Sequence, residues 1–216
     1  MTRYAIVGGG PKEYIPNLST YKNEDIIWIG ADQGAEVIVE YGLPLSAAIG
    51  DFDSVSASSM ETIKKEAHEL MVYPNEKNET DLELAILYAQ EQEARHILFF
   101  GVTGGRMDHT LINIQTLYPL WNSGIRAQIH DLQNQMELFG QGSHTIGRNE
   151  DYPYLSFVPI TLDIWNLNLY GFYYPLEDAH LPYGSTLCIS NHLIEEEGTF
   201  SFSQGILLVI RSKDII

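Results

Sequence analysis

The chain has 216 residues, 44% hydrophobic and 19% charged, which is the composition of a globular protein able to bury a core in one or two domains. The 29 acidic and 12 basic residues give a net charge of −17, which argues against nucleic acid as a partner, because phosphate backbones require a basic face. No apolar stretch approaches the ~20 residues of a transmembrane helix, and no signal-peptide layout is present. We therefore expect a soluble, cytoplasmic protein without a membrane partner.

Short apolar runs alternate with helix-length amphipathic segments up to about residue 130, which predicts βαβ units and a mostly parallel sheet covered on both faces. We expect helices near 33–41, 57–69, 81–93 and 109–121. The expected strands are Tyr4–Val7, Ile26–Ile29, Ala47–Ile49, Met71–Tyr73, Ile97–Phe100 and Ile125–His130.

From about Asp131 the helical periodicity fades and short β-rich runs appear between turn signals. We predict a three-layer α/β domain over residues 1–131 and a smaller all-β sandwich over residues 132–216, packed together without a long linker. Cys188, the single cysteine, excludes an internal disulfide and is interpreted as a small core residue. The expected strands are Tyr154–Val158, Leu162–Ile164, Ser185–Ile189, Thr199–Phe202 and Ile206–Ile210, and the expected turns are 140–142, 147–149 and 182–184.

Five aspartates stand where a strand of the first domain should give way to a loop or helix: Asp32, Asp51, Asp53, Asp81 and Asp108. If the strands are parallel, all five lie along one edge of the sheet. Two carboxylates about 5 Å apart repel by roughly 3 kcal/mol at an effective dielectric constant near 20, so such a cluster favours a bound divalent cation. All-oxygen ligands are typical of magnesium, and the cluster therefore indicates phosphate chemistry.

The first pair lies in Gly50-Asp51-Phe52-Asp53-Ser54, directly after an expected strand. Residues i and i+2 of an extended segment project to the same side, so Asp51 and Asp53 are expected to point together into the crevice outside the strand ends. An ordinary turn rich in Asp and Ser is the alternative interpretation.

A second motif, Gly101-Val102-Thr103-Gly104-Gly105-Arg106-Met107-Asp108-His109, lies between an expected strand and helix. Its glycines allow backbone N–H groups to approach phosphate oxygens at a helix N-terminus, and Arg106 would add a guanidinium contact. The motif matches neither the Walker A nor the Rossmann pattern. A plain strand-to-helix turn is the alternative.

A third motif, Glu76-Lys77-Asn78-Glu79-Thr80-Asp81, precedes the best-marked helix. Thr80 and Glu83 form a capping-box pair, which places Asp81 in the first helical turn. Lys77 is positioned to reach a polyphosphate, although a surface ion pair would give the same sequence pattern.

Together these segments resemble the thiamine pyrophosphokinase family, whose members move a diphosphate from ATP to thiamine. The resemblance rests on the motifs above, on Gly30-Ala31-Asp32-Gln33-Gly34-Ala35, and on the C-terminal segments Gly171–Leu176 and Ser190-Asn191. It implies a homodimer of two-domain subunits with thiamine held where two chains meet. Gln33 stands where members often have glycine and Asn78 where they often have aspartate, so no metal-ligand role is assigned to position 78.

The resemblance also implies roles for individual residues. Asp51, Asp53 and Asp81 are assigned to magnesium, and Asp108 is assigned to orienting substrate or accepting a proton. These four aspartates are the expected catalytic residues. Ser190 and Asn191 are assigned to the aminopyrimidine of thiamine, with nearby aromatic rings stacking on the ligand. Asp32 is a candidate for contact with nucleotide or metal. The residues assigned to ATP and its phosphates are Asp32, Lys77, Thr103, Gly104, Gly105, Arg106 and His109.

Three other function classes remain open at this point. The same strand-end groups would serve another nucleotide-dependent phosphotransferase or a phosphohydrolase. A non-catalytic nucleotide sensor would not need so many acids around a leaving group. A structural or interaction protein is disfavoured by the clustering of the acids at strand ends.

Overall fold

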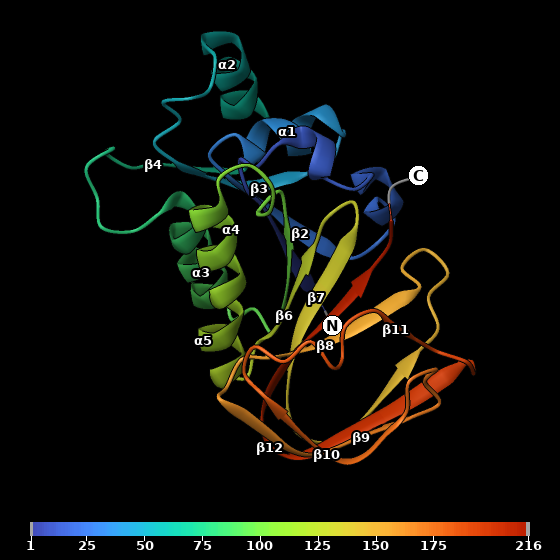
Figure 1. Cartoon of the computed structure of the whole chain (residues 1–216). Coiled ribbons are helices and arrows are strands. Elements are labelled where there is room, and N and C mark those ends of the chain that lie inside the picture. The colour runs from blue at the N-terminus through green and yellow to red at the C-terminus, as the bar shows by residue number, and fades with distance from the viewer. Residues whose placement is uncertain (1, 215–216) are drawn as a thin grey trace. The chain divides into compact units, whose positions relative to one another are not determined.

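The computed structural model describes residues 2–214, which form two compact units divided between Leu132 and Gln133. We call these the α/β unit and the β unit and describe each by itself (Figure 1). Among the described residues, no helix combines the length and apolar character that membrane crossing requires.

The α/β unit is built on a six-stranded sheet in which every pairing is parallel. The strands follow the order β6-β5-β1-β2-β3-β4, so the order reverses between β1 and β5. Ligands of open α/β sheets bind outside the carboxyl ends of the strands near such a switch point. The strand bounds are β1 Arg3–Val7, β2 Ile26–Ala31, β3 Leu45–Gly50, β4 Glu69–Val72, β5 His96–Phe100 and β6 Arg126–His130.

Helices cover both faces of this sheet, which confirms the predicted three-layer α/β fold. Helices α1 and α3 both pack on β1, β2 and β3, and α5 packs on β6. Figure 1 shows α3, α4 and α5 in one column, apart from α1 and α2. The helix bounds are α1 Gly34–Glu40, α2 Ala57–Glu66, α3 Asp81–Glu91, α4 Met107–Gln115 and α5 Leu117–Asn122, with short 3₁₀ turns at Lys12–Tyr14 and Leu18–Tyr21.

The β unit is antiparallel throughout the pairings described. Its long strand β12 pairs with β7 along most of its length, with β9 near its start and with β8 near its end. A register shift between Phe202 and Ile206 divides β12 into a first part, which lies beside β9, and a second part, which lies beside β8. Strand β7 pairs with both parts. The strand bounds are β7 Asn134–Gly147, β8 Tyr154–Pro159, β9 Asp163–Tyr170, β10 Leu176–Pro182, β11 Asn191–His192 and β12 Glu197–Ser212.

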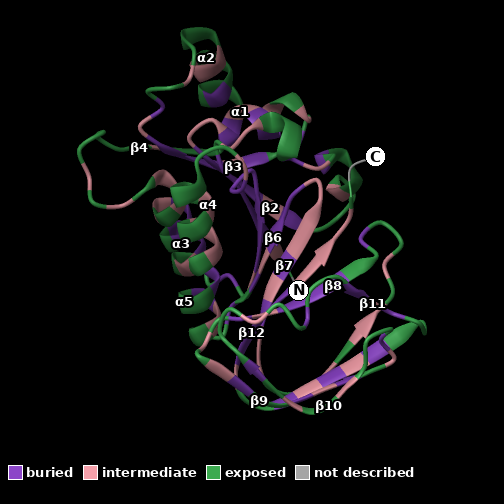
Figure 2. Ribbon diagram, viewed as in Figure 1, coloured by how far each residue is buried: buried purple, intermediate pink, exposed green. Residues whose placement is uncertain are grey.

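Each unit buries its own apolar core, visible as purple segments in Figure 2. In the α/β unit, Trp28 and Phe100 stack within a cluster that also includes Phe52. In the β unit, Phe157, Phe172 and Phe200 pack edge to face, and Cys188 lies beside them at 2% exposure. Its place in this buried cluster confirms the interpretation of Cys188 as a core residue, and burial raises the pKa of its thiol to about 11.

Several element predictions for the β unit were wrong. Ser185–Ile189 is a turn rather than a strand: Ile189 N–H donates to the carbonyl of Thr186, and the bend brings Cys188 to the core. The segments at Thr199–Phe202 and Ile206–Ile210 are two halves of one bulged strand, β12. Residues 140–142, expected to turn, lie inside β7, because pairing with β12 continues through both glycines.

Two further predictions differ in detail. The helix expected near 109–121 is two helices, α4 and α5, which meet at Thr116, three residues before Pro119. The strand expected at Leu162–Ile164 extends to Tyr170 as β9, and strands β7, β10 and β11 were not predicted.

Candidate active site

Three aspartates meet at the carboxyl ends of β2 and β3. Asp32 directly follows β2, and Asp51 and Asp53 follow β3. One carboxylate oxygen from each lies within 4.8 Å of the others. Asp32 and Asp51 are half-buried and Asp53 is exposed, so the cluster opens to solvent on one side. Of the five aspartates expected along one edge of the sheet, these three converge there.

Asp51 and Asp53 come together by a different route from the one predicted. The segment is not extended, because Phe52 between them has φ 57° and turns the chain sharply. The Asp53 N–H donates to Asp51 Oδ1 at 3.2 Å and closes the turn. Left-handed backbone is unfavourable for a residue with a Cβ, and burial of the Phe52 ring in the core holds it in place.

Asp32 also has a left-handed backbone, with φ 50°. Its Oδ2 accepts a 2.6 Å hydrogen bond from the Ser54 hydroxyl. Its Oδ1 is buried and has no hydrogen-bond partner within residues 2–214. Burial raises the pKa of Asp32, and the nearby charges of Asp81 and Asp51 act in the same direction.

Lys77, which precedes α3, forms ion pairs with both Asp51 and Asp81. Its Nζ lies 3.3 Å from Asp51 Oδ2 and 2.9 Å from Asp81 Oδ1, and its side chain is only 12% exposed. Burial lowers the pKa of Lys77, but hydrogen bonds and charge attraction to Asp81 and Asp51 outweigh it and raise the pKa overall. The pKa of Asp51 is lowered, first by the Asp53 N–H and then by Lys77.

Helix α3 starts as predicted. Thr80 is its N-cap, and the Thr80 hydroxyl accepts from the Glu83 N–H at 3.2 Å. Asp81 therefore occupies the first turn, where the helix dipole favours a negative charge.

The donor set at the strand ends fits a hard divalent cation. Three carboxylates converge there, and the unpartnered, buried Asp32 Oδ1 is an acceptor that protein donors leave unused. Such a group is costly unless a donor or a cation reaches it. Asp51 and Asp53, expected to bind metal, converge with Asp32, which was expected to contact nucleotide or metal. Asp81, also expected to bind metal, is not in this group and pairs with Lys77.

The glycine-arginine loop follows β5 at the switch point of the sheet. Gly104 and Gly105 both have positive φ, and an added Cβ at Gly104 would lie 2.7 Å from the Tyr14 ring. The buried Thr103 hydroxyl donates to Asp131 at 2.9 Å, so this side chain is already engaged within the unit. Only backbone groups of Thr103 remain for the phosphate contact predicted at this position.

Arg106 and Asp108 pair with each other at the start of α4. Two hydrogen bonds join the guanidinium to the carboxylate, at 3.1 and 2.6 Å, and both side chains are highly exposed. Arg106 lowers the pKa of Asp108. Asp108 and the neighbouring exposed His109 are not members of the aspartate cluster formed by Asp32, Asp51 and Asp53.

Glycines let the loop after β1 approach two other segments closely. Gly10 N–H donates to the carbonyl of Gly101, and a Cβ at Gly10 would lie 2.5 Å from that oxygen. A Cβ at Gly34 would lie 1.8 Å from the carbonyl oxygen of Val7. Gln33, by contrast, has φ −57° and donates to the carbonyl of Ser54, so a non-glycine residue fits there without strain.

In the β unit, Asn191 is buried at 2% exposure and bonded to backbone on both sides of its amide. Its Oδ1 accepts from the N–H groups of Tyr174 and His192, and its Nδ2 donates to the carbonyl of Tyr174. Ser190 has φ 57° and donates its N–H to the Ser156 hydroxyl. One N–H of the Asn191 amide and the Ser190 hydroxyl remain for the predicted ligand contacts.

Exposed aromatic rings surround this pair. Tyr173 and Tyr174 are 56% and 59% exposed. The Tyr173 ring stacks on the His192 ring, with 4.7 Å between the ring centroids. Flat, exposed rings of this kind suit a heteroaromatic or cationic ligand.

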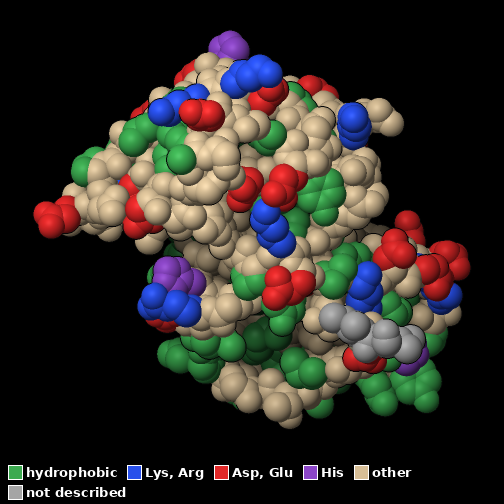
Figure 3. All heavy atoms as spheres, turned by 90° about the horizontal axis from the view of Figure 1, so that it is seen from above, with side chains coloured by type: hydrophobic (Ala, Val, Ile, Leu, Met, Phe, Trp, Pro, Cys, Tyr) green, Lys and Arg blue, Asp and Glu red, His purple; other side chains and the backbone are tan. Residues whose placement is uncertain are grey.

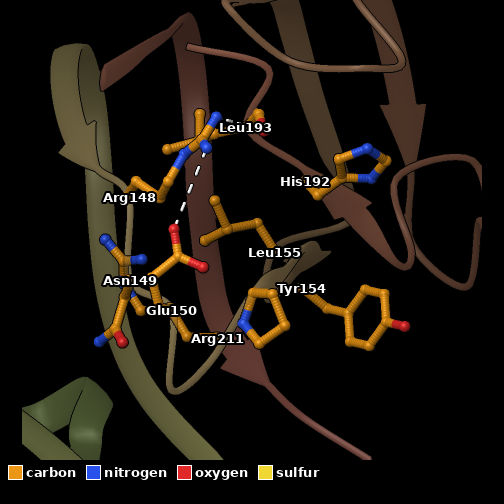
Figure 4. A pocket seen from close by; sticks show the side chains of 9 residues that line it. Arg148, Asn149, Glu150, Tyr154, Leu155, His192, Leu193 and Arg211 are labelled. Atoms are coloured by element: carbon orange, nitrogen blue, oxygen red, sulfur yellow. Dashed lines mark hydrogen bonds and ion pairs between the residues drawn. The ribbon is translucent and has the colours of Figure 1, made fainter. Parts of the chain in front are cut away.

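His192 also borders a pocket of ≈ 280 Å³ within the β unit (Figure 4). In this pocket Arg148 faces the Glu150 carboxylate at 4.0 Å, and Tyr154 lies on the same side as His192. Arg211 also lines it and donates to the carbonyl of Gly147. Sequence reasoning missed this pocket, because Arg148 and Arg211 lie far apart in the chain and no motif joins them.

The net charge is not concentrated in one patch on the face shown in Figure 3. Acidic side chains are spread over that face, several of them beside lysine or arginine. The aspartate cluster is thus distinguished by the convergence of its oxygens and not by a general excess of negative charge.

Two family models match the chain: the catalytic domain of thiamin pyrophosphokinase over residues 18–129, and its vitamin B1 binding domain over residues 143–207. A thiamine pyrophosphokinase from Bacillus subtilis is 46% identical over 209 residues, which cover 97% of this chain and 98% of that protein. The chain belongs to the thiamine pyrophosphokinase family. It is therefore an enzyme of this family, and the resemblance inferred from the motifs is confirmed.

Solved structures agree with this assignment. The crystal structure of the Bacillus subtilis thiamine pyrophosphokinase superposes with a TM-score of 0.93 at 45% identity, covering 99% of this chain and all of that one. The Geobacillus thermodenitrificans structure gives 0.89 at 42% identity, with coverages of 99% and 98%. The thiamin pyrophosphokinase from Candida albicans, at 17% identity and a TM-score of 0.79, covers 97% and 89% and shows the same fold.

Two supporting groups of the site were not assigned from sequence. Ser54 bonds to Asp32, and Asn75 donates to Asp53 Oδ2 at 3.3 Å. Ser54 directly follows the Asp51–Asp53 pair in the sequence, so a supporting role in the site could have been predicted from its position. Asn75 comes from the β4–α3 loop, and nothing in its local sequence indicates that contact.

Proposed function

We propose that this enzyme transfers the β,γ-diphosphate of ATP to the hydroxyl of thiamine, giving thiamine diphosphate and AMP. The observation that carries the proposal is the convergence of Asp32, Asp51 and Asp53 outside the strand ends of a family member's catalytic domain. Diphosphoryl transfer depends chiefly on alignment and on neutralising phosphate charge, which such a cluster supports through a cation.

Magnesium is the proposed cofactor. Asp32, Asp51 and Asp53 would hold it, directly or through water, and Asp81 would belong to the same site once its partner Lys77 moves. When bound, the cation supplies positive charge that bridges the carboxylates to phosphate oxygens.

Protein donors would hold the remaining phosphate charge. The positive-φ glycines Gly104 and Gly105 permit close backbone approach, and Arg106 is exposed enough to leave Asp108 for a phosphate. We assign Thr103, Lys77 and His109 to the same nucleotide side, Thr103 through its backbone.

Asp108 is proposed to orient substrate. Because Arg106 holds its pKa below the usual value, its carboxylate is a weak base at neutral pH, and a role in positioning or in electrostatic stabilisation is favoured over proton removal.

Thiamine is proposed to bind at Ser190 and Asn191, with its rings against the exposed tyrosines Tyr173 and Tyr174. We also propose a homodimer in which the thiamine site lies where two chains meet. A β unit that exposes several large aromatic side chains supports such an arrangement.

The test is the nucleotide product. The purified protein is incubated with ATP and Mg²⁺, with and without thiamine, and AMP, ADP and thiamine diphosphate are quantified. We expect AMP and thiamine diphosphate in equal amounts, and no AMP without thiamine. ADP as the product, or thiamine-independent turnover, would instead favour another phosphotransferase or a phosphohydrolase, and ATP binding without turnover would favour a sensor.

A further inference from the structure

Lys77 fills the gap between two carboxylates of the site. Its ammonium lies 2.9 Å from Asp81 Oδ1, 3.3 Å from Asp51 Oδ2 and 3.4 Å from the carbonyl oxygen of Pro74. Two of its three N–H groups donate to Asp51 and to the Pro74 carbonyl, and its charge pairs with Asp81. In this arrangement most of the donor capacity of Lys77 is directed at protein acceptors.

In the part of the chain that the structure describes, Lys77 is the only basic residue in direct contact with these acids. Within residues 2–214, no other lysine or arginine nitrogen lies within 4.0 Å of Asp32, Asp51, Asp53 or Asp81. The side chain is 12% exposed, so solvent screens the pairing only in part.

A cation entering the cluster would compete with this ammonium. Both oxygens of Asp51 are already used, Oδ1 by the Asp53 N–H and Oδ2 by Lys77. Asp32 Oδ1 is an unused acceptor. A divalent ion that binds there and reaches Asp51 would therefore bring positive charge towards the Lys77 ammonium, and like charges at this range repel strongly.

We propose that Lys77 is an internal counter-ion that holds Asp51 and Asp81 together before metal arrives, and that metal binding releases its ammonium from these carboxylates. The released ammonium then has donors available for the phosphates that accompany the metal. Metal and nucleotide binding are thereby coupled through one side chain. This last step rests on the proposed nucleotide-dependent function, whereas the competition for the carboxylates does not.

The experiment measures metal binding without nucleotide or thiamine. Mn²⁺ is titrated into the wild-type protein and the Lys77→Met variant, and bound ion is followed by electron paramagnetic resonance. Methionine keeps an unbranched stem of similar length without the charge. We expect Mn²⁺ to bind about tenfold more tightly to the variant, because its competitor is gone. Mg²⁺ should displace the bound Mn²⁺ in both proteins.

Two control variants isolate the cause. Lys12→Met removes a lysine that bridges Glu36 and Glu40 on the surface, so it reproduces the change in net charge without altering the cluster. Lys77→Arg keeps a positive charge at position 77. Both are expected to bind Mn²⁺ as the wild type does, and circular dichroism checks that all four proteins are folded.

Equal or weaker Mn²⁺ binding in folded Lys77→Met, or no binding at all, would overturn the proposal, since a counter-ion whose removal exposes no stronger site is not a competitor. Tighter binding in Lys12→Met to the same extent would also overturn it, because the effect would then come from net charge alone. The outcome is independent of whether thiamine is the acceptor.

Discussion

Asp32 of the α/β unit follows strand β2, and Asn191 of the β unit begins strand β11. Both are polar side chains at or beside positive-φ backbone, yet their surroundings differ. Asp32 keeps a buried oxygen that no described donor reaches. The side-chain amide of Asn191 uses its oxygen and one N–H in hydrogen bonds to the backbone of Tyr174 and His192. A polar group left unsatisfied by the fold is available for chemistry, whereas a satisfied one maintains the fold. The α/β unit should therefore lose activity, and the β unit stability, when such residues are changed.

The largest effect is expected for Asp53→Asn. This substitution removes one negative charge from the aspartate cluster, while its only described side-chain contact is with Asn75. We predict a fall in turnover of roughly 10²–10⁴-fold with an almost unchanged melting temperature, because the residue is exposed and charge at the reacting phosphates is lost.

Steady-state AMP release and thermal melting check this prediction. Asp151→Asn, at an exposed position of the β unit, is the matched control and should retain full turnover. Near-normal activity of Asp53→Asn with unchanged magnesium dependence would remove Asp53 from the site.

The α/β unit should also be sensitive to acid through His130. Burial lowers the pKa of His130 to about 4, against 6.5 for an unperturbed histidine, so the unfolded chain takes up the proton first as the pH falls. Its contribution to stability is complete above pH 6.5 and is lost towards pH 4, by about 3 kcal/mol.

Urea unfolding at pH 7 and pH 4.5 measures this loss. In His130→Phe, which keeps a ring beside Phe100 and Tyr21, the pH dependence should be smaller by most of that amount. An identical pH dependence in the two proteins would show that other groups are responsible.

A smaller loss of stability is expected for Asn191→Ala in the β unit. The substitution leaves partly buried backbone N–H groups of Tyr174 and His192 without their partner, which costs about 2 kcal/mol. Ser190→Ala removes only a hydroxyl without a described partner. It should leave the unfolding free energy within ~0.5 kcal/mol and raise the KM for thiamine.

Chemical denaturation of both variants gives the comparison directly. If Asn191→Ala were as stable as the wild type, the structural role of this amide would be refuted.

The smallest effect is expected for Gln33→Gly, which restores the residue that family members often have. Gln33 has ordinary helical backbone and one 3.3 Å hydrogen bond, so activity and stability should change little, within ~0.5 kcal/mol. Gly34→Ala is the contrasting control, because its Cβ would collide with the Val7 carbonyl, and it should be strongly destabilised. Equal melting temperatures of the two variants would contradict the claim that position 34 requires glycine and position 33 does not.

Much of the α/β unit follows from its sequence. Apolar runs separated by amphipathic segments mark parallel strands and covering helices, and parallel strands place Asp32 and Asp51 at one edge without further information. The left-handed backbone at Phe52 was not predictable in this way. It depends on the burial of the Phe52 ring among residues distant in sequence, which local propensity does not report.

The β unit was predicted less well because its pattern depends on pairing between distant strands. Gly140 and Gly142 resemble a turn, yet β12 pairs with both, and the bulge after Phe202 makes one strand look like two. The structural role of Asn191 was not predicted either, because the backbone groups of Tyr174 that bond to it lie 17 residues away in the sequence. The family resemblance pointed to this segment, but the sequence does not show which of its hydrogen bonds serve the fold.

We expect a divalent cation to bind where Asp32, Asp51 and Asp53 converge. The most direct measurement is the anomalous scattering of Mn²⁺ in crystals grown with a non-hydrolysable ATP analogue. We predict a peak about 2.1–2.2 Å from carboxylate oxygens of these residues, or within one water of them, close to the analogue's phosphates. A well-occupied peak elsewhere, with the three carboxylates free of metal, would contradict the account.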